Sequence, residues 1–139
     1  SSDLCHTPVF DYELMLVAAQ EHALAGGGAV TPERLSQTRL IHFPVARERL
    51  DVFTHFLSPA GLEPLHQQEV EAMEIMLQLV AANRGVCTLP DWLAERYRDS
   101  HPIATRRLGE EGVHKTLYLV YRQADAGIDY LADFVGYGR

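Results

Sequence analysis

The chain has 139 residues, of which 47% are hydrophobic and 22% charged, and its formal net charge is −7. This length and composition predict one domain with a core, or one domain and a fragment, and exclude a disordered segment or a coiled coil. The acidic balance argues against wrapping a phosphate backbone, because nucleic-acid affinity comes largely from Lys and Arg. No run reaches the roughly 20 apolar residues that a membrane span needs.

Cys5 and Cys87 are the two cysteines, and their spacing is not that of a disulfide scaffold. We therefore expect both thiols to be reduced, which favours the cytoplasm.

Apolar residues recur at strand and helix spacings in turn along the chain. Thr31 before Pro32 is typical of a helix start, with a hydroxyl cap and a proline in the first turn. The expected elements are, in order, strand 9–19, helix 31–35, strand 40–43, helix from about 47 to 58, strand 66–70, helix 72–83, strand 85–90, helix 91–97, an apolar segment 103–108, strand 116–121 and helix 128–137. This alternation predicts an α/β fold.

Residues 80–90 are the most informative segment, because an apolar helix there is expected to end on Gly85 and run into a short buried strand closed by Pro90. Helix, glycine, strand and proline in that order describe one step of a parallel α/β sheet. A right-handed connection places the ends of strands 40–43 and 85–90 at the same edge of the sheet. Open sheets of this class bind small molecules at such an edge.

The loop after strand 40–43 carries the first group of candidate binding residues. A helix start offers backbone N–H groups and a favourable dipole to a carboxylate. The alternative is that Phe43 and Val45 pack in the core and that Arg47 is a solvated residue. Arg49 is expected to point elsewhere and to lie on the surface. The candidates in this loop are His42, Phe43, Pro44, Val45 and Arg47.

The second strand adds Cys87 and Thr88, whose side chains alternate between the two faces. Thr88 is a candidate hydrogen-bonding group for a ligand, whereas Cys87 is expected to be a small buried apolar residue. The seven histidines include no pair at zinc-protease spacing, and no phosphate-binding or nucleotide-binding motif is present. The sequence therefore predicts no metal site and no cofactor.

Segments 13–17, 21–25, 31–35 and 80–90, in this order and spacing, resemble the effector-binding domain of LysR-type transcriptional regulators. The resemblance covers most of the chain. It implies a periplasmic-binding-protein-like fold of type 2, with a mixed sheet flanked by helices, two α/β subdomains and an effector in the cleft between them. It also implies a protein that senses a small molecule and performs no chemistry.

Segments 9–13, 50–53, 55–57 and 59–61 are similar, more narrowly, to the members of this family that control methionine-biosynthesis genes in response to homocysteine. Homocysteine is therefore the expected effector. Its carboxylate is expected near the helix start at residues 44–47, with polar help from Thr88.

The same resemblance implies a division of the chain. Residues 1–8 would be a hinge stub of the first subdomain, 9–108 the second α/β subdomain, and 109–139 the return strand and helix of the first subdomain. The family's DNA-binding domain is expected outside this chain, so promoter DNA would be reached only through that domain. No membrane partner is expected.

Helix 72–83 has an apolar stripe wider than one packing face requires, because Ile75 and Leu79 extend it. This breadth predicts a homo-oligomer, a dimer or tetramer, with one of the two residues at the interface. Two other functions stay open at this point. One is a solute-binding protein of similar fold that delivers a small metabolite to a transporter, and the other is a small α/β enzyme using His42 and Cys87.

Overall fold

The computed structural model describes residues 4–122 and 127–135. The chain divides into two compact units, residues 14–113 and residues 1–13 with 114–139. The strands are β1 Leu4–Ala19, β2 Arg39–His42, β3 His66–Glu69, β4 Cys87–Pro90, β5 Ile103–Arg107, β6 Val113–Arg122 and β7 Gly127–Val135. The helices are α1 Pro32–Ser36, α2 Met73–Ala81 and α3 Asp91–Arg98, and the tighter or wider turns are η1 Ala23–Gly26, η2 Arg47–Arg49, η3 Phe53–Leu57 and η4 Ser58–Ala60. Among the described residues, no helix is long and apolar enough to cross a membrane.

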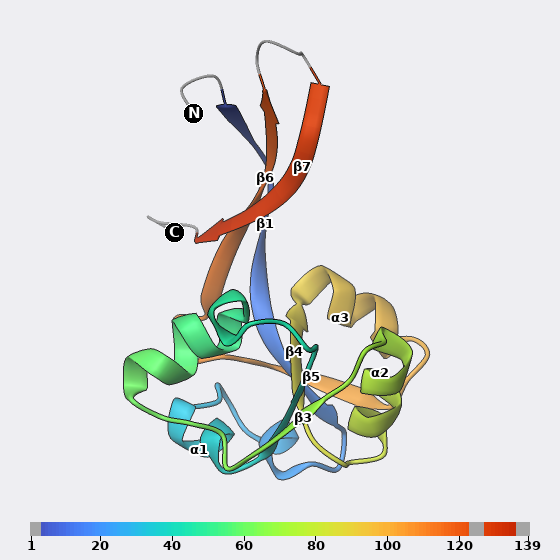
Figure 1. The fold of residues 1–139 in the computed structure, drawn as a ribbon. Coiled ribbons are helices and arrows are strands. Elements are labelled where there is room, and N and C mark those ends of the chain that lie inside the picture. The colour runs from blue at the N-terminus through green and yellow to red at the C-terminus, as the bar shows by residue number, and fades with distance from the viewer. Residues whose placement is uncertain (1–3, 123–126, 136–139) are drawn as a thin grey trace. The chain divides into compact units, whose positions relative to one another are not determined.

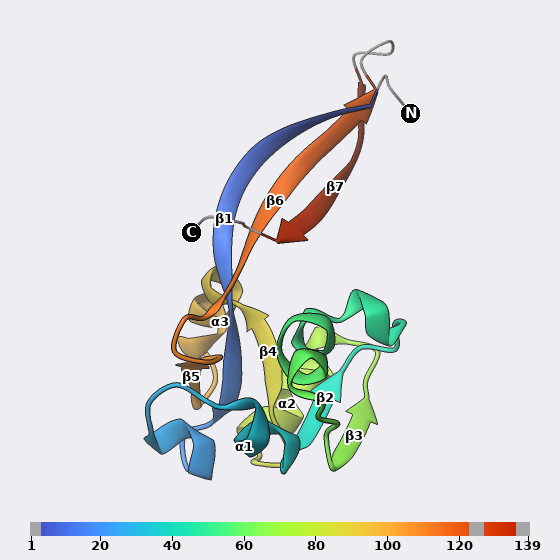
Figure 2. The ribbon, with the colours of Figure 1, turned by 90° about the vertical axis from the view of Figure 1, so that its left-hand side faces the viewer.

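The strands of the unit of residues 14–113 belong to two sheets that a single bridge joins. The second half of β1 pairs antiparallel with β4 on one side and with β5 on the other. β2 and β3 are parallel and lie side by side in Figure 2. A parallel bridge between Leu40 and Val86 joins β2 to the start of β4. The predicted neighbourhood of strands 40–43 and 85–90 is therefore confirmed. The predicted parallel sheet is confirmed only in part, because β4 is parallel to β2 at this bridge but pairs antiparallel with β1.

Strand alternation divides the apolar side chains of this unit into two hydrophobic clusters. Neighbouring residues of β1 and of β2 belong to different clusters, because successive side chains point to opposite faces of a strand. Figure 1 shows α1 on one side of these strands and α2 with α3 on the other. The first cluster comprises Leu14, Leu16, Ala18, Leu24, Val30, Leu35, Leu40, Val52, Phe53, Phe56, Leu57, Val86, Leu108 and Val113. The second cluster comprises Val17, Ile41, Val70, Met76, Leu77, Val80, Cys87, Leu89, Ala94 and Ile103.

The start of α1 agrees with its sequence signal, because Thr31 Oγ1 accepts a hydrogen bond from the Arg34 N–H at 3.2 Å. The end of α2 differs from the prediction. The helix ends at Ala81, and the left-handed residue after it is Asn83, with φ of 62°. The Arg84 N–H donates to the Leu79 carbonyl at 2.9 Å, which closes the turn in the usual Schellman manner.

Gly85 has a different role from the helix end that was expected. It lies where β4 approaches β2, and a Cβ added to it would lie 2.9 Å from the Arg39 carbonyl oxygen and 2.8 Å from Ile41 Cδ1. Glycine is needed at this position because the two backbones come so close together that a side chain would not fit.

The expected helix from about residue 47 to 58 is present only in part. A 3-10 turn at η2 is followed by an extended Leu50, with φ of −101° and ψ of 110°, and then by the π-helical turn η3 and the 3-10 turn η4. The spacing of the apolar residues in this segment is compatible with an α-helix, a 3-10 helix or a π-helix. The type of turn was therefore decided by the packing of Phe53, Phe56 and Leu57 into the first cluster.

The described residues of the other unit form strands. β6 lies between β1 and β7 in the strand order, and β6 and β7 are antiparallel with a register shift between Val120 and Tyr121. Thr116 Oγ1 donates a hydrogen bond to Asp11 Oδ1 at 2.7 Å, which ties β6 to β1.

The helix predicted over 128–137 is wrong, because residues 127–135 form β7; residues 136 and 137 lie outside the described part. Apolar residues also recur at every second position from 128 to 134, so periodicity alone did not separate helix from strand. Pairing with β6 selected the strand.

Candidate ligand-binding pocket

A cavity of about 140 Å³ opens where β2 and β4 end and the η2 loop passes over them. Its polar lining consists of four side chains of different chemistry, namely His42, Arg49, Asp51 and Thr88. Its apolar lining comes from both hydrophobic clusters and the residues packed on them, namely Leu14, Ile41, Phe43, Leu50, Val52 and Met76. An apolar cavity of roughly 150 Å³ holds a molecule the size of benzene, so this pocket suits a small organic group.

His42 forms a rigid part of the wall. Its side chain is buried, and its ring meets the Phe53 ring edge to face, with 5.8 Å between centroids. Nδ1 lies 2.9 Å from the Phe43 carbonyl oxygen, so Nδ1–H is the donor there. Nε2 lies 3.1 Å from Gln67 Oε1. Both ring nitrogens are thus engaged within the protein.

Thr88 and Cys87 occupy opposite faces of β4, as predicted. Thr88 is half-buried and lines the pocket, whereas Cys87 is fully buried in the second cluster. Burial without compensating polar contacts raises the pKa of the Cys87 thiol to about 12. At neutral pH the group is a neutral thiol, so Cys87 is a poor nucleophile for the small α/β enzyme that was considered as an alternative.

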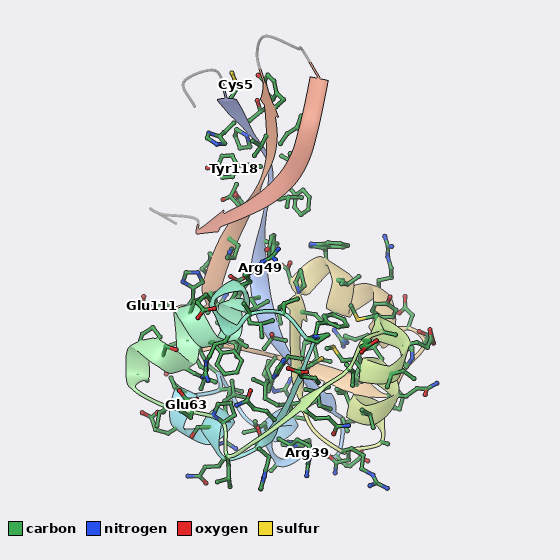
Figure 3. The ribbon with its side chains drawn as sticks, in the orientation of Figure 1. Cys5, Arg39, Arg49, Glu63, Glu111 and Tyr118 are labelled. Atoms are coloured by element: carbon green, nitrogen blue, oxygen red, sulfur yellow. The ribbon has the colours of Figure 1, made fainter. Side chains whose placement is uncertain are left out.

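Arg47 and Arg49 exchange the roles expected for them. The Arg47 guanidinium lies over the Phe53 ring, 4.2 Å from its centroid, and Nη2 is 2.6 Å from Glu63 Oε1. Arg47 therefore packs along the outside of the first cluster and does not line the pocket. Arg49 was expected to point away, yet it lines the pocket. Figure 3 shows Arg49 and Glu63 at clearly different places on this unit.

Asp51 is a pocket residue that sequence reasoning missed. It contributes a carboxylate beside Leu50, and His55 Nε2 lies 3.8 Å from Oδ1, one helical turn further on. The signal for Asp51 and Arg49 was their position two residues apart, which puts both on one side of the extended Leu50. The apolar residues of this segment predicted a helix, and in a helix two residues at this spacing would not lie on the same side.

The structure brings together three of the seven predicted binding residues, His42, Phe43 and Thr88. Pro44 and Val45 are exposed and lie outside the lining. Within the described part of the chain, no group of three or more His, Cys, Asp or Glu residues is arranged to hold a metal ion.

A mixed α/β fold with a pocket at the strand ends is an arrangement in which open α/β sheets hold small ligands. The family model described as the LysR substrate binding domain matches residues 1–138, and the chain belongs to this family. The fold is thus the periplasmic-binding-protein-like fold that the resemblance implied.

Relatives with related names support the narrower similarity. The HTH-type transcriptional regulator MetR of Escherichia coli is 40% identical over 124 residues, which are 89% of this chain and 38% of that protein. MetR of Haemophilus influenzae is 30% identical over 134 residues, which are 96% of this chain and 43% of that protein. The chain thus spans about two fifths of the length of these relatives. The MetR regulatory domain of N. meningitidis, a LysR family regulator, is similar in structure, with a TM-score of 0.83 and 25% identity over 96% of this chain and 70% of that one.

Proposed function

We propose that this effector-binding domain controls methionine biosynthesis with homocysteine as its co-effector. The observation that carries the proposal is the pocket itself, in which an apolar wall and four polar side chains meet at the ends of β2 and β4. The 40% identity to a regulator named MetR supports the choice of pathway. His42, Phe43 and Thr88 are retained as the predicted residues in direct contact with the effector.

The domain acts in this proposal by binding alone. A ligand that prefers one of two conformations shifts their populations, and that shift is the output of a sensing domain. The relatives are named as transcriptional regulators, and the buried Cys87 offers no thiolate for covalent chemistry. Promoter DNA would be contacted by residues outside this chain, which fits its net charge of −7.

The division of the chain into a hinge stub at 1–8, a second subdomain at 9–108 and a return segment at 109–139 forms part of this proposal. A cavity of about 140 Å³ is smaller than the roughly 300–1,000 Å³ of ordinary ligand sites, as expected for a wall that shares its ligand with a second subdomain.

Self-association belongs to the same proposal. Ile75 is 47% exposed on α2, whereas Leu79 packs partly against the second cluster, so Ile75 is the interface residue of the two. Sedimentation of the full-length protein should show a dimer or tetramer, and Ile75→Ser should weaken it. A monomer at high concentration would contradict this part.

Calorimetric titration of the full-length protein with L-homocysteine tests the effector. We expect saturable binding, and we expect transcription from a methionine-biosynthesis promoter to respond to homocysteine only when the protein is present. Binding of a different metabolite with no heat from homocysteine would overturn the effector assignment and leave the fold and family intact.

A further inference from the structure

We infer that Met76 is the residue that limits how long an apolar ligand chain this pocket accepts. The inference rests on the proposed function, because it assigns a specificity-determining residue to the same pocket. Met76 would act on any ligand whose apolar chain enters the cavity, so its role is measured by the ratio between the affinities for ligands of different length.

The lining of the pocket divides into a charged part and an apolar part. Arg49 and Asp51 come from the segment around the end of η2. Ile41 and Met76 belong to the second cluster, and Phe43 packs against that cluster. Apolar groups gain free energy when such a surface removes them from water. The apolar chain of a ligand is therefore expected to extend along these residues.

Burial places Met76 at the inner end of this apolar part. The residue is only 2% exposed, whereas Phe43 is half-buried and lies nearer to solvent. Met76 is also the one lining residue that α2 contributes. A ligand chain that grows along the apolar lining therefore passes Phe43 first and then meets Met76.

Ile41 borders the same part of the pocket, but the sheet fixes its position. Its backbone N–H donates to the Val86 carbonyl at 2.8 Å. Its Cδ1 lies 2.8 Å from the place that a Cβ on Gly85 would take, so the side chain packs into the close approach of β2 and β4. Met76 has a long, unbranched side chain on a helix and fills the space that remains. Shortening it should therefore lengthen the pocket and leave the rest of the wall in place.

Three ligands of increasing length measure this limit by calorimetry on the full-length protein. They are L-homocysteine, L-methionine and L-ethionine, which share their charged groups and end in a thiol, a methyl thioether and an ethyl thioether. Wild-type affinity should fall in this order by about tenfold at each step, because one additional carbon in a filled apolar pocket has an effect of that size.

Variants at position 76 should change the ratio between these affinities. Met76→Ala should raise the affinity for L-ethionine relative to L-homocysteine by about tenfold or more, since the longer chain fills the space that the variant leaves. Met76→Leu conserves volume and should keep the wild-type ratio. Met76→Val removes less of the side chain, so it should shift the ratio less and in the same direction, and it serves as the test if Met76→Ala does not fold.

Met73→Ala is the matched control. Met73 is a half-buried methionine one turn earlier on α2, and it packs against the second cluster without lining the pocket. Its replacement should leave the ratio unchanged. General damage to the domain would weaken all three ligands together and also leave the ratio unchanged, so a shift of the ratio identifies a specificity-determining residue.

The same titrations distinguish the role of Met76 from the proposed effector. Homocysteine binding with the same ratio in the wild type and in Met76→Ala would overturn the role of Met76 and sustain the proposed function. Binding of L-methionine and L-ethionine without homocysteine, with a ratio between the two that Met76→Ala shifts by about tenfold, would sustain Met76 and overturn homocysteine. Failure of all three ligands to bind the wild-type protein would overturn both.

Discussion

The two hydrophobic clusters pack on the same strands, yet they are covered by helices of different regularity. The second cluster lies under α2 and α3, two ordinary α-helices with Leu, Val and Met on their inner faces. The first cluster lies under the short helix α1 and the π turn η3, which runs directly into the 3-10 turn η4, and Phe53 and Phe56 fill the space.

The difference extends to the residues that line the proposed binding pocket. The irregular side supplies Arg49, Leu50, Asp51 and Val52 to the pocket, whereas the helices of the regular side supply only Met76. Departures from regular helix often occur at functional sites, because they redirect side chains that a regular helix would turn outward. The first cluster therefore both supports the unit and aims the pocket residues.

Phe53→Ala should have the largest effect. The ring is 1% exposed and contacts His42 and the Arg47 guanidinium, so its loss should cost about 3–5 kcal/mol of unfolding free energy and weaken ligand binding as well. Urea unfolding and calorimetry measure the two effects. Leu77→Ala in the second cluster is the matched variant and should cost about 2–5 kcal/mol with ligand affinity kept. Equal losses of affinity in both variants would erase the distinction between the clusters.

Cys87 tests how completely the second cluster excludes water. Its pKa is raised to about 12 by burial, so the folded protein keeps the thiol proton after an unfolded chain has lost it. The unfolding free energy should therefore fall as pH rises from about 9 towards 12, by about 1.4 kcal/mol per pH unit from this group. Cys87→Ala should lack that component of the slope.

The rate of reaction with a thiol reagent measures the accessibility of Cys87 independently. At pH 8, one of the two cysteines, the half-buried Cys5, should react in the folded protein, and Cys87 should react only on unfolding. Rapid labelling of Cys87 in the native state would show that the second cluster opens readily.

Gly85→Ala tests the close approach of β2 and β4, which lies between the clusters. The added Cβ would meet the Arg39 carbonyl oxygen at 2.9 Å, and backbone cannot yield as a side chain does. We expect a loss of about 1–3 kcal/mol in thermal or urea unfolding. Gly28→Ala is the control, because nothing lies within 4 Å of its added Cβ, and it should stay within about 0.5 kcal/mol of wild type.

His22 should give the smallest effect, at the edge of the first cluster. Its Nδ1 accepts a hydrogen bond from the Leu24 N–H at 3.0 Å, and burial lowers the pKa of the ring below its usual value of 6.5. The stability due to this lowered pKa is present above pH 6.5 and is lost as pH falls through the folded-state pKa. His22→Asn keeps a capping acceptor without that titration, so its unfolding free energy should vary less between pH 7 and 5. An unchanged pH profile would show that His22 contributes nothing to it.

Regular elements were largely predictable from the sequence. Thr31 and Pro32 placed the start of α1, the apolar periodicity placed α2 and α3, and the short apolar runs placed β2 and β4. These signals are local, because capping and periodicity depend on residues within a few positions of each other. The α/β class and the meeting of two strand ends at one edge followed from the same signals.

The tertiary structure decided what local signals leave ambiguous. Residues 127–135 satisfy both helix and strand spacing, and pairing with β6 made them β7. Arg47 and Arg49 are two arginines in the same short segment. Arg47 contacts the Phe53 ring and Glu63, whereas Arg49 lines the pocket. Which of two similar residues lines the pocket depends on partners distant in sequence, so only packing against the first cluster could settle it.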